Sequence, residues 1–323
     1  MRLPTLADML QTRATVAESS DFGPQGTKRV GKFDAKRLVV VTALVYEGEL
    51  NALAAMWVLL ENPSLLRSDV QAALVLARPE EREVAANMNR VSDNDRPDTY
   101  EFSRIDVLFQ AFGDTGATMP IAVLDVQENS QPATADGWVM DIRRGSQLCD
   151  ATPSPLRIEG VTHAQYNATE TVPFGAAIFL SPTIEVLAHA HNQPGGIKAA
   201  VKAVLSVLAG LDCLAEDVMI TTEKSDQRVL EVVGTINVPD STKSYTLDSS
   251  LLTPFAPVNA GQIVGRSTDG TIEVQSPRNG VLCLGPSKTD VSTGRQDPFF
   301  YLAVEQQPRK RTLRYPTWLD TVG

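Results

Sequence analysis

The chain has 323 residues, 43% hydrophobic content and a formal net charge of −10, which together are typical of a packed globular protein and not of a disordered one. Because an acidic surface repels a phosphate backbone, we do not expect nucleic-acid binding. No stretch approaches the ~20 consecutive apolar residues of a membrane span, and the three scattered cysteines form neither a disulfide framework nor a zinc knuckle, so we expect a cytoplasmic protein with no membrane partner.

Strand and helix patterns alternate over the first two thirds of the chain. Residues 37–45 (RLVVVTALV) are typical of a strand buried on both faces, and residues 49–60 carry apolar residues at helical spacing as far as Asn62-Pro63. Further strands are predicted at 70–76, 121–126 and 176–180, and further helices at 96–112 and 196–211. This order predicts an α/β fold, a mixed and mostly parallel sheet with helices on both faces.

The pattern changes near residue 222. From there on, no long helix is indicated, and Gly, Pro, Asn and Asp separate short runs of β character at 228–238, 244–252, 261–265, 270–274 and 299–304. We therefore predict two domains, a catalytic-type α/β domain over 1–221 and a small C-terminal β-sandwich or half-barrel over 222–323. Two roles stay open for the second domain, which are closing over a pocket and forming a homo-oligomer contact. The basic residues near the end are interpreted as a solvated terminus and not as an interaction arm; they are Arg309, Lys310, Arg311 and Arg314.

Polar residues cluster where the predicted strands end, which is where ligands bind in open α/β sheets. Tyr46-Glu-Gly-Glu49 follows the first strand, Asp125-Val-Gln-Glu128 ends the third, and Thr183-Ile-Glu185 follows the fourth. Asn89 and Arg90 add an amide and a guanidinium that suit a carboxylate. No Gly-rich loop follows a strand, so no nucleotide cofactor is implied.

The order of these motifs resembles the succinylglutamate desuccinylase/aspartoacylase family, a branch of the zinc carboxypeptidase-like clan. That family shows a strand, H-G-x-E, a helix, N-R, D-x-H-E and T-x-E in this order, and the resemblance covers most of residues 37–211. Residues 256–281 are similar to its C-terminal β-domain. The resemblance implies a zinc carboxypeptidase-like fold, zinc as the cofactor, and a deacylase that cleaves the amide bond of a small N-acyl amino acid or related carboxylate substrate.

The metal positions depart from the pattern of the family. Tyr46 stands where the first zinc-binding histidine is expected and Gln127 where the second is expected, so only Glu49 matches a metal ligand. A neutral phenol, whose ordinary pKa is ~10, and a glutamine carbonyl are poor zinc ligands. We therefore predict a degenerate metal site without tight catalytic zinc.

The resemblance also assigns roles to residues outside the metal positions. Glu185 matches the glutamate that transfers protons during amide cleavage, and Asn89 with Arg90 matches the pair that binds the substrate carboxylate. Tyr46 and Gln127 are then expected to line the substrate site.

Other interpretations stay open. Because both histidines are lost, the chain could be a catalytically inactive small-molecule-binding or regulatory protein on the same fold. His189 and His191 follow Glu185 closely and could form a relocated metal site with it, although a polar loop before a helix is their plainer interpretation. Likewise, Glu49 could cap a helix, and 125–128 could be an ordinary polar strand end.

Overall fold

The structure, a computed structural model, describes residues 1–23, 25–43, 50–76, 91–92, 119–129, 137–164, 171–172, 181–189, 192–193, 195–285, 289–291 and 299–322. Several predicted features lie outside the described residues, namely the helix at 96–112, the strand at 176–180, Tyr46, Glu49, Asn89, Arg90 and His191.

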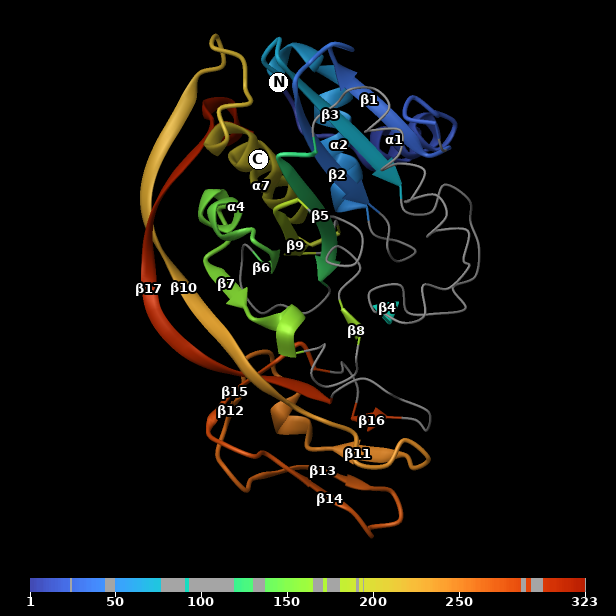
Figure 1. Ribbon diagram of the computed structural model, residues 1–323, viewed down its shortest axis with the longest axis vertical. Helices are drawn as coiled ribbons and strands as arrows, with labels where there is room; N and C mark the ends of the chain where they lie inside the picture. Colours follow the sequence, from blue (N-terminus) through green and yellow to red (C-terminus); the bar gives the residue numbers. More distant parts are fainter. Residues whose placement is uncertain are drawn as a thin grey trace.

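The first part of the chain is built on a mixed, largely parallel sheet (Figure 1). In chain order its strands are β1 (Thr27–Gly31), β2 (Arg37–Ala43), β3 (Val70–Leu76), β5 (Ala122–Asn129), β6 (Trp138–Arg143), β7 (Leu156–Glu159) and β9 (Thr183–His189). The strands β3, β2, β5 and β9 are parallel neighbours in that order, β1 closes one edge antiparallel to β3, and β6 pairs antiparallel with β9 and parallel with β7. A separate pair of short strands is formed by β4 (Val91–Ser92) and β8 (Thr171–Val172).

Five described helices of the first part share one hydrophobic core with one face of this sheet. They are α1 (Leu6–Ala17), α2 (Asn51–Glu61), η1 (Pro63–Leu65), α4 (Ser146–Ala151) and α7 (Gly196–Gly210). The two long apolar helices are those that the sequence predicts: α2 ends before Pro63, which cannot continue a helix, and α7 packs its apolar stripe on the sheet. No helix in the described part of the chain is long and apolar enough to cross a bilayer.

Two 17-residue strands, β10 (Ile220–Ile236) and β17 (Phe300–Pro316), form an antiparallel ribbon along one side of the molecule (Figure 1). β10 pairs with β7, and β17 pairs with β15 (Gly280–Cys283), which pairs with β12 (Pro257–Val258), so one sheet continues into the β-rich part. A small antiparallel sheet completes that part with β11 (Tyr245–Leu247), β13 (Ile263–Ser267), β14 (Glu273–Gln275) and β16 (Asp290–Val291), beside the short helix η2 (Ser249–Leu251).

The ribbon corrects part of the interpretation of the basic C-terminal residues as a solvated terminus: Arg309, Lys310 and Arg314 are exposed, but they belong to a paired strand. All four lie within β17, and Arg311 is buried, where it donates to the carbonyl oxygens of Thr152 and Pro153. Tyr315, together with η3 (Thr317–Asp320), packs into the core that holds the first helices. Because β17 returns to that core, both parts of the chain share the ribbon, and the division into 1–221 and 222–323 stays a prediction.

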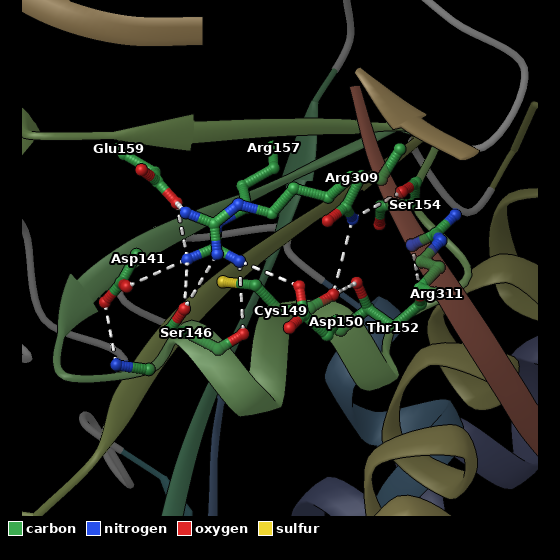
Figure 2. Close-up of polar contacts among 12 residues, drawn as sticks. Asp141, Ser146, Cys149, Asp150, Thr152, Ser154, Arg157, Glu159, Arg309 and Arg311 are labelled. Carbon is green, nitrogen blue, oxygen red and sulfur yellow. Dashed lines mark hydrogen bonds and ion pairs between the residues drawn. The ribbon is translucent and has the colours of Figure 1, made fainter. Parts of the chain in front are cut away.

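A buried ion cluster joins the ribbon to the first part of the chain (Figure 2). The guanidinium of Arg157 on β7 lies 3.3 Å from Asp141, 2.9 Å from Asp150 and 2.5 Å from Glu159. Arg309 of β17 lies 3.1 Å from the same Glu159. The side chain of Arg157 is 1% exposed, so this charge depends on its three carboxylates in place of water.

Candidate functional site

Four polar side chains lie together on the sheet face opposite α1, α2, α4 and α7. Thr42 of β2, Asp125 of β5 and Glu185 of β9 are register partners on adjacent strands, so they form a row on one face. Gln127 lies two residues along β5 and therefore faces the same way. All four are buried, between 2% and 7% exposed. We call Thr42, Asp125, Gln127 and Glu185 the polar cluster.

Asp125 is the centre of this cluster. Thr42 Oγ1 donates to Asp125 Oδ1 at 2.7 Å, and Gln127 Nε2 donates to Asp125 Oδ2 at 3.0 Å. Burial raises the pKa of Asp125, although both hydrogen bonds favour its ionised form. The amide of Gln127 therefore has a fixed orientation, with its nitrogen held on Asp125.

The face beside the polar cluster is apolar. Across β9, the register partner of Glu185 is Met140, and that of Leu187 is Trp138. The indole of Trp138 meets the ring of Phe255, from the β-rich part, edge to face at 5.5 Å. The β-rich part thus packs directly against β6, the strand next to β9, on the face that carries the polar cluster.

Glu128 of β5 contacts the start of α2 and not the polar cluster. Its Oε1 accepts hydrogen bonds from the backbone N–H groups of Leu50 at 2.5 Å and Asn51 at 2.9 Å, so it caps the start of α2. We raised Glu49 as a helix cap, and it lies outside the described residues. The sequence signal could not reveal Glu128 in this role, because the contact joins residues 77 positions apart.

The structure places two of the predicted site residues together. Gln127 and Glu185 share a sheet face on neighbouring strands, which puts their Cα atoms about 8 Å apart. Glu185 lies inside β9 and not in a loop after a strand, which corrects that part of the prediction. Thr42 was not predicted as a site residue, although it has the one hydroxyl side chain in the apolar run RLVVVTA and could have been identified by that. The convergence of the other site residues stays a prediction, since these lie outside the described residues: Tyr46, Glu49, Asn89 and Arg90.

The described residues of the cluster do not fit a zinc centre. Asp125 is engaged by two hydrogen bonds, and Gln127 offers an amide where an imidazole is expected. No group of three or more His, Cys, Asp or Glu residues suited to a metal occurs among the described residues. His189 lies four residues beyond Glu185 on β9, which separates their Cα atoms by about 13 Å. The two side chains are therefore too far apart to bind one ion.

No family model and no curated protein matches the chain, but solved structures do. Succinylglutamate desuccinylase from Vibrio parahaemolyticus matches with a TM-score of 0.60 at 13% identity over 88% of this chain and 87% of that one. The fold is aspartoacylase-like. Succinylglutamate desuccinylase/aspartoacylase from Rhodobacter sphaeroides matches this fold at TM-score 0.55, 12% identity and 87% and 89% coverage, and murine aminoacylase 3 at 0.53, 16% and 87% and 98%.

These likenesses confirm the resemblance at the level of the fold. Coverage near nine tenths of both chains means that the aspartoacylase-like fold includes the β-rich part as well as the first sheet. The polar cluster therefore sits in a fold whose solved examples include proteins named as a succinylglutamate desuccinylase and an aminoacylase. At 12–16% identity, the likeness extends to the fold and not to the activity.

Proposed function

We propose that the chain is a deacylase-like hydrolase that acts on the amide bond of a small N-acyl amino acid or related carboxylate. The observation that carries this proposal is the burial of Gln127 and Glu185 beside Asp125 on adjacent strands of an aspartoacylase-like fold. Buried polar groups are costly unless they serve a hydrogen-bonded structure or a ligand, and here they gather at the strands that the motif order marks.

Glu185 is the proposed general acid and base. It would take a proton from the attacking water and return it to the leaving amine, which is a task for a carboxylate held near the scissile bond. Gln127 would hold the substrate, since Asp125 fixes its amide in one orientation. Asn89 and Arg90 are proposed to bind the substrate carboxylate, with Tyr46 and Glu49 lining the same site.

Zinc has no part in this proposal, because the residues at its expected positions do not fit it. A tyrosine and a glutamine replace the two histidines, and Glu49 alone matches a ligand. A catalytic zinc ion usually polarises the carbonyl and activates water, contributions of several kcal/mol. Without that contribution, amide hydrolysis is expected to be slow.

A second candidate function is ligand binding without turnover. The specific observation in its favour is the hydrogen bond from Gln127 Nε2 to Asp125, which holds an amide at the position where a zinc-binding histidine is expected. A protein of this kind would keep the ligand-binding residues and the fold but lose the chemistry.

Calorimetry and an amine-release assay separate these functions. N-acetyl-L-aspartate and N-succinyl-L-glutamate would be titrated into the full chain, and free amine would be measured over long incubation. Binding with turnover that Glu185→Gln abolishes supports the deacylase, whereas binding without turnover supports the second candidate. Glu305→Gln, at an exposed ion pair with Arg228, is the matched control. If neither compound binds, the proposal is wrong for these substrates.

A further inference from the structure

A cavity of about 360 Å³ lies between α1 and α2, which are neighbours on the helix-covered face of the sheet (Figure 1). The polar cluster is on the opposite face. Small-molecule sites have volumes of about 300–1,000 Å³, so the size of this cavity suits a small ligand. The lining residues that decide its chemistry are Arg2 and Asp8 on one side and Trp57, Leu60 and Glu61 of α2 on the other.

The side chain of Arg2 shows what kind of group this cavity holds. Its Nη1 and Nη2 donate to the two carboxylate oxygens of Asp8, at 2.7 and 3.0 Å. The same guanidinium lies over the ring of Trp57, 4.7 Å from the ring centroid. A forked pair of charge-assisted hydrogen bonds and an aromatic face together favour a planar cation. We call Asp8 and Trp57 the guanidinium seat.

The seat is held in place by contacts that do not involve Arg2. Thr5 donates to Asp8 Oδ2 through its backbone N–H at 2.7 Å and through its hydroxyl at 2.6 Å, within the capping box of α1. The hydrogen bonds from Arg2 and Thr5 hold the pKa of Asp8 well below its usual range, so this carboxylate is charged at neutral pH. Trp57 packs against the hydrophobic core. Both parts of the seat are therefore preorganised for a ligand.

Arg2 leaves the seat at a small cost, and the cavity is negative without it. The side chain of Arg2 is 57% exposed, and exposed ion pairs contribute little to stability. Mainly the hydrogen bonds with Asp8, and in smaller part the charge of Glu61, raise the pKa of Arg2. Once Arg2 is displaced, two carboxylates and an indole remain, so the cavity favours a cation over a neutral or anionic ligand.

We propose that this cavity binds a small alkylguanidinium compound, whose guanidinium takes the place of Arg2 in the guanidinium seat while its alkyl chain lies against Leu60. Arg2 is then an internal competitor for the site. Such a competitor lowers the apparent affinity by the fraction of time that it occupies the seat. The site is separate from the polar cluster, and the proposal does not depend on the function proposed above.

The test titrates the full chain with butylguanidinium and with butylurea, a neutral molecule of nearly the same shape, by calorimetry. Arg2→Ser should bind butylguanidinium about twofold to thirtyfold more tightly than the unaltered chain, because an exposed ion pair and a cation–π contact no longer compete. Arg13→Ser is the matched control: it removes a positive charge from α1 at a residue that does not line the cavity, and it should bind as the unaltered chain does.

Two further variants, made in the Arg2→Ser chain, test the seat itself. Asp8→Asn should weaken the binding of butylguanidinium about tenfold or more, since the hydrogen bonds lose their charged acceptor. Trp57→Leu should weaken it about twofold to fivefold, since the apolar contact stays but the aromatic face is lost. Circular dichroism checks that both variants fold.

Three results would overturn the proposal: no binding of butylguanidinium to Arg2→Ser, equal binding to Arg2→Ser and Arg13→Ser, or equal binding of butylguanidinium and butylurea to Arg2→Ser. The contact of Arg2 with Asp8 and Trp57 would then only fasten the segment before α1 to α2. These comparisons stand even if Asp8→Asn or Trp57→Leu does not fold, because they use substitutions at residues outside the seat.

Discussion

Replacing Arg157 by methionine removes the positive centre of the cluster that joins the ribbon to the first sheet (Figure 2). In the folded chain, two guanidinium groups, of Arg157 and Arg309, face three carboxylates. The substitution keeps most of the side-chain volume but leaves one cation against three anions. Removing one partner of a buried ion pair usually costs about 3–5 kcal/mol, because the remaining charge stays buried without compensation.

The structure places the expected loss at the lower end of that range. The side chains of Asp141, Glu159 and Asp150 are 18%, 24% and 42% exposed, so water reaches each of them in part. Glu159 also keeps Arg309 at 3.1 Å. We therefore expect Arg157→Met to lower the free energy of unfolding by about 3 kcal/mol.

Arg228→Met is the matched control, because Arg228 also lies where β7 meets β10 and also pairs with a carboxylate. Its guanidinium lies 2.8 Å from Glu305, but the two side chains are 43% and 53% exposed, and exposed pairs contribute about 0–1 kcal/mol. Urea unfolding of both variants, followed by circular dichroism, gives the two losses. If Arg157→Met costs no more than Arg228→Met, the burial argument is wrong.

Three further predictions concern stability. Burial raises the pKa of Asp125, so the contribution of this residue to the free energy of unfolding is largest in acid and is lost as pH rises through the folded-state pKa. The free energy of unfolding of the wild type, relative to Asp125→Asn, should therefore fall from acid to neutral pH in urea titrations. A difference that stays constant with pH would contradict this. Glu128→Ala should cost about 1–2 kcal/mol in the same assay, because two N–H groups at the start of α2 lose their acceptor. Gly137→Ala should cost more than Gly261→Ala. Both glycines have positive φ, at 68° and 77°, but of the two only Gly137 has backbone, the carbonyl oxygen of Leu187, where the added Cβ would lie. Equal losses of thermal stability would refute that reasoning.

The elements that the sequence predicts well are those whose burial pattern is local. β3 matches the predicted residues 70–76, and α7 ends one residue from its predicted end, because continuous or periodic apolar residues indicate burial directly. α1 lacks such a pattern: it buries only Met9, Thr12 and Val16. The start of α1 is fixed by a capping box between Thr5 and Asp8, and no helix was predicted there.

The site is harder to predict from the sequence than the fold is, for a physical reason. β9 places Glu185 and His189 in the middle and at the end of a buried strand, whereas polar residues after an apolar run at 176–180 indicate a loop. What stabilises them there is pairing with β5 and contact with α2, which join residues 60 or more positions apart. Motif order predicted that Glu185 and Gln127 belong to one site; it could not predict that Thr42 joins them on the same sheet face or that Glu128 caps α2 on the other face.

The contact between Gln127 and Asp125 bears on how this chain differs from a zinc enzyme. A metal-binding histidine commonly donates its second ring N–H to a carboxylate, which fixes the ring for the metal. Gln127 makes the corresponding donation to Asp125 through Nε2, so the donor side of the arrangement is kept. The atom on the other side of the side chain changes from an imidazole nitrogen, which is a good zinc ligand, to the amide oxygen of Gln127. An amide oxygen accepts hydrogen bonds more readily than it binds zinc. A position kept for its orientation but changed in its ligand chemistry is suited to contact a substrate directly. On this argument, the amide oxygen of Gln127 would do by hydrogen bonding what a metal does in a zinc deacylase, which is to hold the substrate amide near Glu185.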